Sequence, residues 1–286
     1  MLDNWIIMFI LAIFFASMTA VFARTALFGL SGPQTLLTAS ASVLVLSFTT
    51  LSFSGFFKSA KAFGKGSIED ILIEGALLAA GFVCLLIALG MAETISTACF
   101  YLLVPVAVFA VNIFLSRKIP QPAPIVINVM TLTGVLAMGF SIKHKKGLWW
   151  LPAFLSVAFL TAERIYAKAN PIGRLERVAE YFVIALIALV LSFVVRHKDL
   201  KKITAYHVLF AIFTGIAFYY GPICLHRALA ISSFDLWLSL IYNLWLVFTV
   251  AFSRLFLREK GSAGTYAGLG LIAGAEVISF VLQNFI

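Results

Sequence analysis

Long apolar runs separated by short polar breaks cover almost the whole chain. Most of the runs are long enough for helices that cross a bilayer, which need about 20 apolar residues. Turn-forming residues or charges occupy the breaks, as in residues 31–33 (SGP) and in the basic stretch 143–146 (KHKK). The pattern predicts ten helices, near residues 4–28, 33–57, 69–90, 94–115, 122–142, 148–169, 178–196, 204–228, 234–256 and 263–284.

Two of the breaks resemble each other, in residues 114–120 (FLSRKIP) and 256–262 (FLREKGS). Each follows a pair of predicted helices that a very short turn joins. The recurrence predicts that a unit of five helices occurs twice, as residues 1–146 and 147–286. Because five is odd, the second copy enters the membrane in the opposite orientation. We therefore expect an all-α integral membrane protein, with ten transmembrane helices in two inverted five-helix repeats.

Composition indicates that lipid is the main solvent of this chain. Of its 286 residues, 62% are hydrophobic and only 12% are charged, whereas a soluble domain carries about 25% charged residues. The three cysteines lie in apolar runs without metal-ligand spacing, so they are expected to pack, and no metal or cofactor is predicted. The first run lacks the basic segment and cleavage site of a signal peptide, and we expect it to be retained as a helix.

The formal net charge of +9 resides mainly in short loops, where Lys and Arg act as topology signals. We therefore expect no nucleic-acid partner. Basic loops after the second and fourth predicted helices favour a cytoplasmic N-terminus. In the second half only Lys168, Arg174 and Arg177 fit this orientation, and the loops after the seventh and ninth helices oppose it. Because the first helices usually dominate, we predict that both termini are cytoplasmic.

Several short motifs resemble one family. Pro105 lies in the fourth predicted helix, within LLVPVAVFAVNIFLSRK, and the charged turns read SRK at 116–118 and REK at 258–260. The fifth and tenth helices carry a small-residue face, formed by Gly134, Gly268, Gly270 and Gly274. With the ten spans and the repeat, these motifs make nearly the whole chain similar to EamA-type transporters of the drug/metabolite transporter superfamily. The stretch FASMTAVFARTALFGLSGP is similar to the start of bacterial aromatic amino-acid exporters.

The resemblance implies a multi-pass protein of the bacterial cytoplasmic (inner) membrane. It also implies a central cavity between the two halves, lined by the first, third, fourth, sixth, eighth and ninth helices. The chain departs from the family pattern at residues 243–246 (NLWL), where a proline is usual, and it lacks the acidic residue of the first turn. These departures predict a substrate pocket that differs from those of better-known relatives.

Aromatic residues are the main candidates for binding a solute, because Tyr and Trp combine an apolar wall with a hydrogen-bonding tip. Tyr101 and Tyr242 fall at equivalent positions of the two repeats. The alternative is that some of these residues form interfacial belts. Two prolines, Pro105 and Pro222, are expected to kink their helices, because each removes a backbone hydrogen bond. The predicted substrate-binding set is Phe100, Tyr101, Tyr219, Trp237, Tyr242 and Trp245.

Three titratable side chains are candidates for coupling or for recognition of a charged solute. A carboxylate such as Glu163 is costly inside a membrane, so it faces a cavity, takes a proton, or pairs with Arg164 or Lys168 near the end of its helix. Arg24 binds a substrate carboxylate or extends to the interface. His226 titrates near physiological pH, or is simply solvated at the end of its helix.

These features predict a secondary transporter that moves a small organic metabolite, an amino acid or a similar amphipathic solute, by alternating access. A lipid or lipid-headgroup translocator on the same fold is an alternative. An intramembrane enzyme is not expected, because the chain has no HExxH or GxSxG motif. The expected partners are the bilayer and the solute. Ten helices suffice in one chain, and both a monomer and a homodimer are compatible with the sequence.

Overall fold

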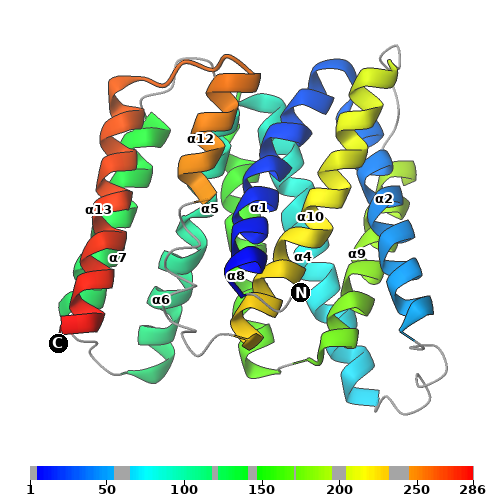
Figure 1. Ribbon diagram of the computed structural model, residues 1–286, viewed down its shortest axis with the longest axis horizontal. Coiled ribbons are helices and arrows are strands. Elements are labelled where there is room, and N and C mark those ends of the chain that lie inside the picture. The colour runs from blue at the N-terminus through cyan, green and yellow to red at the C-terminus, as the bar shows by residue number, and fades with distance from the viewer. Residues whose placement is uncertain are drawn as a thin grey trace.

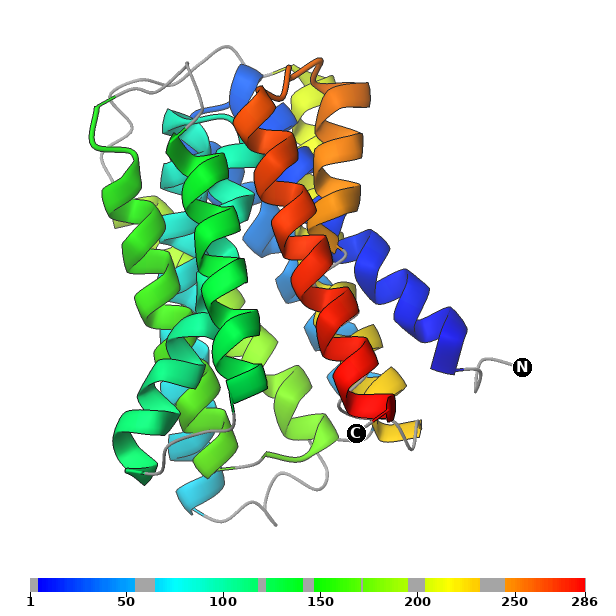
Figure 2. The ribbon, with the colours of Figure 1, turned by 90° about the vertical axis from the view of Figure 1, so that its left-hand side faces the viewer.

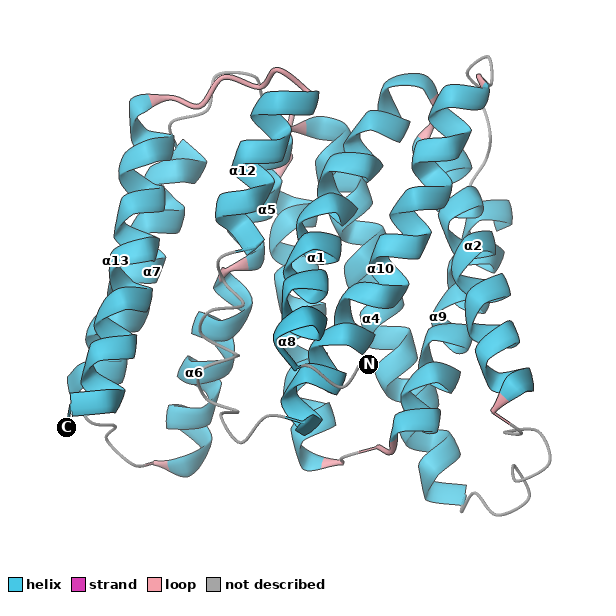
Figure 3. Cartoon of the chain, viewed as in Figure 1, coloured by secondary structure: helices cyan, strands magenta, loops and turns pink. Residues whose placement is uncertain are grey.

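The computed structural model describes residues 5–54, 65–117, 122–140, 147–170, 172–194, 204–231 and 245–285. Within these ranges all regular structure is helical, as Figure 3 shows. The helices are α1 (Trp5–Gly29), α2 (Gly32–Phe53), α4 (Lys65–Met91), α5 (Thr94–Tyr101), α6 (Leu103–Ser116), α7 (Pro122–Phe140), α8 (Trp150–Ala169), α9 (Arg174–Val194), α10 (Ala205–Ile231), α12 (Trp245–Phe256) and α13 (Ala263–Phe285). With α5 and α6 counted as one interrupted helix, a helix lies at each of the ten predicted positions, which confirms a helix at each of them. Residues 234–244 of the ninth predicted helix lie outside the described residues.

Two helices begin four residues before their expected starts, α4 at Lys65 and α9 at Arg174. The sequence pattern places residues 170–177 between two predicted helices, but α9 already includes Arg174 to Arg177. Arg177 therefore lies in the first turn of a helix instead of a loop. This placement matters for the site described below, because the side chain of Arg177 is directed into the bundle and is only 17% exposed.

The turn between α1 and α2 is set by local sequence. The Ser31 hydroxyl accepts a hydrogen bond from the backbone N–H of Gln34 at 3.4 Å, and the Gln34 side chain accepts one from the backbone N–H of Ser31 at 2.7 Å. This reciprocal pair is a capping box. Pro33 lies in the first turn of α2, where a missing N–H costs nothing.

Pro105 accounts for the interruption between α5 and α6. A proline has no N–H to donate to the carbonyl four residues earlier, which here belongs to Tyr101. The helix breaks next to that carbonyl, at Leu102, whose own N–H reverts to Cys99 three residues back at 3.1 Å. The break leaves Tyr101 at the end of a short helix, with its side chain directed toward the middle of the molecule.

Two helix pairs form the opposite edges of the molecule in Figure 1, α7 with α13 and α2 with α9. Figure 2 shows α7 and α13 running side by side. They approach closely because Gly134 and Gly268 meet, and a Cβ atom on either glycine would lie within 2.7 Å of the other's carbonyl oxygen. Between the edges, α1 packs along α10 and α4 packs along α8. These central helices hold the site.

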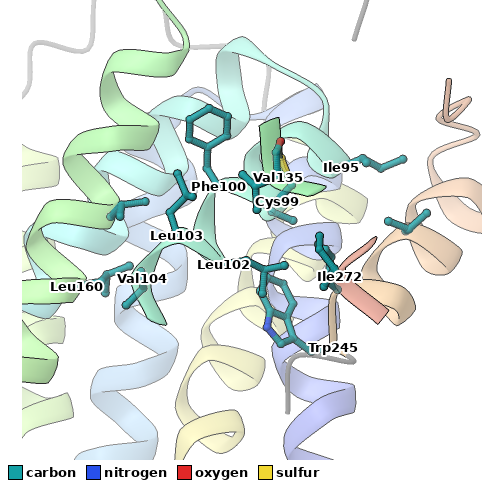
Figure 4. Packing of buried hydrophobic residues seen from close by; sticks show 14 of the residues in the cluster. Ile95, Cys99, Phe100, Leu102, Leu103, Val104, Val135, Leu160, Trp245 and Ile272 are labelled. Carbon is teal, nitrogen blue, oxygen red and sulfur yellow. Dashed lines mark hydrogen bonds between the residues drawn. The ribbon is translucent and has the colours of Figure 1, made fainter. Parts of the chain in front are cut away.

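The largest buried cluster fills the space between α5, α6, α8, α12 and their neighbours. Figure 4 shows part of this cluster, with Leu102 and Trp245 among its residues. Cys99 and Cys224 are buried in this cluster, as expected of packing residues. Large apolar side chains also face outward, among them Phe48, Leu72 and Leu186, and contiguous exposed apolar surface is typical of a protein that contacts lipid.

Among the described residues, five helical segments are long and apolar enough to cross a membrane: Trp5–Gly29, Gly32–Phe53, Ile68–Met91, Thr94–Leu115 and Ala205–Leu225. Shorter apolar helices accompany them in α7, α12 and α13. The helical architecture is thus consistent with a membrane protein, as the hydropathy pattern predicts.

Candidate functional site: a central cavity with a carboxylate cluster

A cavity lies between the central helices and is lined by side chains of α1, α4, α5, α8, α9, α10 and α12. The empty space inside it and at its mouth is about 950 Å³. Its lining divides into two parts of different chemistry. One part is aromatic and aliphatic, and the other carries four charged side chains, namely Glu163, Arg164, Arg177 and Glu180.

The aromatic part is built from ring contacts, of which two are edge-on and one, between Phe82 and Phe218, is tilted. Tyr101 of α5 and Trp245 of α12 are T-shaped, with ring centroids 5.5 Å apart and an interplanar angle of 86°. On the other side, Phe218 of α10 lies 4.2 Å from Phe82 of α4 and 5.9 Å from Tyr181 of α9. Such pairs hold their rings in fixed orientations. The result is a firm apolar wall for the non-polar part of a ligand.

The charged part centres on three carboxylates from three helices, Glu74 of α4, Glu163 of α8 and Glu180 of α9. One oxygen atom of each lies within 4.8 Å of the others, and all three residues are buried. Nη1 of Arg177 donates to Oε2 of Glu74 at 2.9 Å and to Oε2 of Glu180 at 3.1 Å. We refer to Glu74, Glu163, Glu180 and Arg177 as the carboxylate cluster.

The carboxylate cluster has one more carboxylate than there are guanidinium groups beside it. The Nε atom of Arg164 lies 3.6 Å from Oε2 of Glu163. Three carboxylates and two guanidinium groups leave one net negative charge when all are ionised. In addition, Oε1 of Glu74 and Oε1 of Glu180 are buried and have no hydrogen-bond partner within the part of the chain that the structure describes.

Local sequence explains how the carboxylate cluster is assembled. Arg177 and Glu180 are three residues apart on α9, so their side chains share one face of the helix. Glu74 reaches them because α4 and α9 approach closely at Gly75, where an added Cβ atom would lie 3.1 Å from Val183. The three-residue spacing on α9 therefore places Arg177 beside Glu180, and the close crossing of α4 and α9 brings Glu74 to both.

Arg164 lines the cavity, and its side chain is 46% exposed, whereas the side chain of Arg177 is 17% exposed. The connection between α8 and α9 lies at this end of the molecule, the lower edge in Figure 1. Nearby, the hydroxyl of Tyr166 donates to Asp70 at 2.8 Å and ties α8 to the start of α4.

The opposite end of the molecule is held by Glu259, in the connection between α12 and α13 at the upper edge of Figures 1 and 3. Its Oε1 accepts hydrogen bonds from the backbone N–H and the hydroxyl of Thr94, each at 3.0 Å, and its Oε2 accepts one from the N–H of Ile95 at 3.3 Å. The carboxylate therefore caps the N-terminus of α5 from a distant part of the chain. We refer to this contact as the Glu259 cap.

Three residues predicted to serve the site line the cavity together: Tyr101, Trp245 and Glu163. Pro222 also lines it, and the helix α10 continues through this proline. Glu163 pairs with Arg164, and it is 4% exposed, so it faces the cavity and not the interface.

Other candidates lie elsewhere in the fold. Tyr219 is buried against Tyr181, and its hydroxyl donates to Thr50 of α2 at 2.8 Å. Phe100 packs edge-on against Trp149 and Phe154, with ring centroids 5.1 Å away from each. Neither residue is among those that line the cavity.

Arg24 lies near the Glu259 cap and not in the cavity. It donates to the carbonyl of Leu89 and lies over the ring of Phe28, 5.1 Å from its centroid. Pro105 is exposed on α6. His226 belongs to α10, but its side chain is outside the described part, and Trp237 and Tyr242 lie outside the described residues altogether.

Sequence reasoning did not single out Glu74 or Glu180. Both stand alone in apolar stretches, ILIEGALL and VAEYFVIAL, and a single carboxylate inside a predicted membrane helix is itself a signal of function. Arg177 was interpreted as a loop residue that marks topology. That interpretation is wrong, because Arg177 lies in α9 and forms ion pairs with Glu74 and Glu180.

Comparison with known proteins supports the arrangement of the helices and does not identify a family or a function. No family model and no curated protein matches the chain. Solved structures do match, and one of them, a crystal structure, has a TM-score of 0.63 at 15% sequence identity over 96% of this chain and 96% of the other. The likeness extends over the whole length, so the arrangement of the helices is one that another protein chain adopts.

Proposed function

We propose that this protein is a secondary transporter that carries a small organic solute across the bacterial cytoplasmic membrane by alternating access. The observation that carries the proposal is the two-part cavity. It lies at the centre of a bundle with an apolar exterior, and it offers aromatic rings on one side and buried charges on the other. Intramembrane charges that face a cavity are typical of substrate and ion pathways.

The helix pairing supports two inverted five-helix repeats, residues 1–146 and 147–286, within the drug/metabolite transporter superfamily. If α1, α2, α4, α5–α6 and α7 correspond to α8, α9, α10, α12 and α13, the contact of α1 with α10 exchanges with that of α8 with α4. Under the same exchange the pairs α2–α9 and α7–α13 map onto themselves. A pseudo-symmetric arrangement of this kind allows one repeat to rock against the other around a central site.

The two ends of the cavity region fit one state of such a cycle. We take the end at Arg164 to be the open one, because this lining side chain is 46% exposed, and the end at the Glu259 cap is held together by hydrogen bonds between the proposed second and first repeats. In the alternate state the Glu259 cap separates and the end at Arg164 closes. With ten spans, both termini lie on the same side, which we propose is the cytoplasm.

The amphipathic lining favours an amphipathic solute, of which an amino acid is the first candidate. An aromatic or aliphatic side chain fits against Tyr101, Trp245 and Phe218, and the polar end faces the charged part of the cavity. The charged part is separate from the apolar part because all charged lining residues lie on α8 and α9.

Counterflow in proteoliposomes tests the proposal. Vesicles preloaded with unlabelled L-phenylalanine, and then with other amino acids, are assayed for uptake of the labelled solute. We expect saturable exchange that Trp245→Ala largely abolishes, because this ring is part of the cavity wall. The matched control is Trp150→Ala, which removes a tryptophan that is 44% exposed on α8 and is not among the cavity-lining residues. Equal loss in both variants, or no exchange of any organic solute, would contradict the proposal.

A further inference from the structure

The free oxygen atoms of the carboxylate cluster point to the chemistry of the solute. Glu180 is fully buried and lines the cavity, yet only its Oε2 is bound, by Arg177. Its Oε1 has no partner within the described part of the chain. A buried carboxylate oxygen without a hydrogen bond raises the free energy of the protein. Binding of a positively charged hydrogen-bond donor from outside the protein would therefore be favourable there.

The carboxylates lie close enough together for one tetrahedral nitrogen to reach two of them. Two acceptor oxygens that each lie about 2.8 Å from an ammonium nitrogen are about 4.6 Å apart. Carboxylate oxygens of Glu163 and Glu180, both in the cavity lining, lie within 4.8 Å of each other. An ammonium group has three donors, so it can bridge both carboxylates without displacing Arg177 from Glu74.

The net charge of the site agrees with a monovalent cation. The three carboxylates exceed the guanidinium groups of Arg164 and Arg177 by one charge when all are ionised. A single ammonium group balances that charge. A bare metal ion fits less well, because the guanidinium of Arg177 already lies against two of the three carboxylates.

We infer that Glu163 and Glu180 form an ammonium-binding subsite, so that the solute is an organic amine or amino acid with an apolar body. This inference rests on the proposed transport function and specifies its substrate class. Arg177 is a positioning residue, since it donates to Glu180, and Glu74 holds Arg177 in turn through its own hydrogen bond.

Three probes with related skeletons test the subsite on the purified full-length protein by isothermal titration calorimetry. L-Phenylalanine carries both charges, 2-phenylethylamine lacks the carboxylate, and 3-phenylpropionate lacks the ammonium group. We expect both amines to bind at least about tenfold more tightly than 3-phenylpropionate, because charge-assisted hydrogen bonds are at stake. Equal affinity of L-phenylalanine and 3-phenylpropionate, or no binding of either amine, would overturn the inference.

Charge-neutralising variants assign the effect to the subsite. Glu163→Gln and Glu180→Gln are each expected to weaken amine binding about tenfold or more and to leave 3-phenylpropionate binding unchanged or stronger. Glu69→Gln is the control, since Glu69 is exposed on α4. If Glu180→Gln fails to fold, Glu163→Gln still tests the subsite. Within the described part of the chain Glu163 forms its ion pair with Arg164, and the ion pairs of Arg177 are with Glu74 and Glu180. Unchanged amine affinity in Glu163→Gln refutes the subsite.

Two further arms separate the possible explanations. Amine titrations in sodium chloride and in choline chloride are expected to agree, and binding that requires sodium would assign the carboxylates to a metal ion and overturn the inference. Counterflow of solutes without an amine, if it occurs while the amines fail to bind, would refute the subsite and leave the proposed transport function standing. Absence of transport for every solute would instead refute the proposed function.

Discussion

At the end of the molecule near α5, both oxygen atoms of Glu259 accept hydrogen bonds from Thr94 and Ile95. At the other end, Glu74 and Glu180 each keep one buried oxygen without a partner in the described residues. Glutamate side chains at the two sites thus differ in how many of their oxygen atoms accept hydrogen bonds. A carboxylate whose two oxygens both accept hydrogen bonds stabilises a helix end. A carboxylate with one oxygen left without a partner can bind a cation through that oxygen. Counting the partners of each oxygen separates a structural glutamate from a candidate binding residue.

The largest expected effect is the loss of Arg177. Arg177→Met leaves the buried carboxylates of Glu74 and Glu180 without a counter-charge, and breaking a buried pair in this way costs about 3–5 kcal/mol. We expect a strongly lowered unfolding temperature and poor yield of folded protein, measured by fluorescence-detected size-exclusion chromatography after heating.

The control for this variant is Lys168→Met, which removes an exposed positive charge at the end of α8. Adding Glu74→Gln and Glu180→Gln to Arg177→Met is expected to restore much of the stability, since it removes the uncompensated charges. If Arg177→Met is as stable as Lys168→Met, the carboxylates are not held by Arg177.

The Glu259 cap is expected to show a smaller effect on stability. Glu259→Ala removes the acceptor of three hydrogen bonds at the N-terminus of α5, and loss of a helix cap costs about 0.5–2 kcal/mol. We expect a lower unfolding temperature than for Lys260→Ala, which changes the neighbouring residue of the same turn.

Thiol labelling tests whether the Glu259 cap closes one end of the cavity. If it does, Glu259→Ala makes the closed state less populated. The cysteine of a Tyr101→Cys variant then reacts faster with a membrane-impermeant thiol reagent added from that side. An unchanged labelling rate in Glu259→Ala would mean that the contact stabilises α5 without closing the cavity.

The smallest stability effect is expected at Glu180, in contrast to its large expected effect on amine binding. In Glu180→Gln the amide oxygen still accepts from Arg177, and the excess negative charge is gone. We expect an unfolding free energy within about 1 kcal/mol of the original protein, measured by thermal unfolding in detergent. A large destabilisation would mean that Glu180 serves the fold in the same way as Glu259.

The helices were accessible from sequence because their signals are local. The length of each apolar run, the capping pair Ser31 and Gln34, and the break at Pro105 all act within a few residues. Three cavity residues, Tyr101, Trp245 and Glu163, were also identified from their residue types inside apolar runs. The start of α9 was misplaced because its first turn is rich in charges, which resemble those of a loop.

Sequence alone determined which segments are helical and that their surroundings are largely apolar, because backbone hydrogen bonds and hydrophobic runs are properties of neighbouring residues. Only the tertiary structure decided which polar side chains meet. Glu74 and Glu180 are 106 positions apart in the chain, and their contact with one arginine depends on how α4 and α9 cross and on which faces they turn to each other. The same is true of Glu259 and the start of α5. Such contacts depend on the packing of whole helices, so no local pattern encodes them.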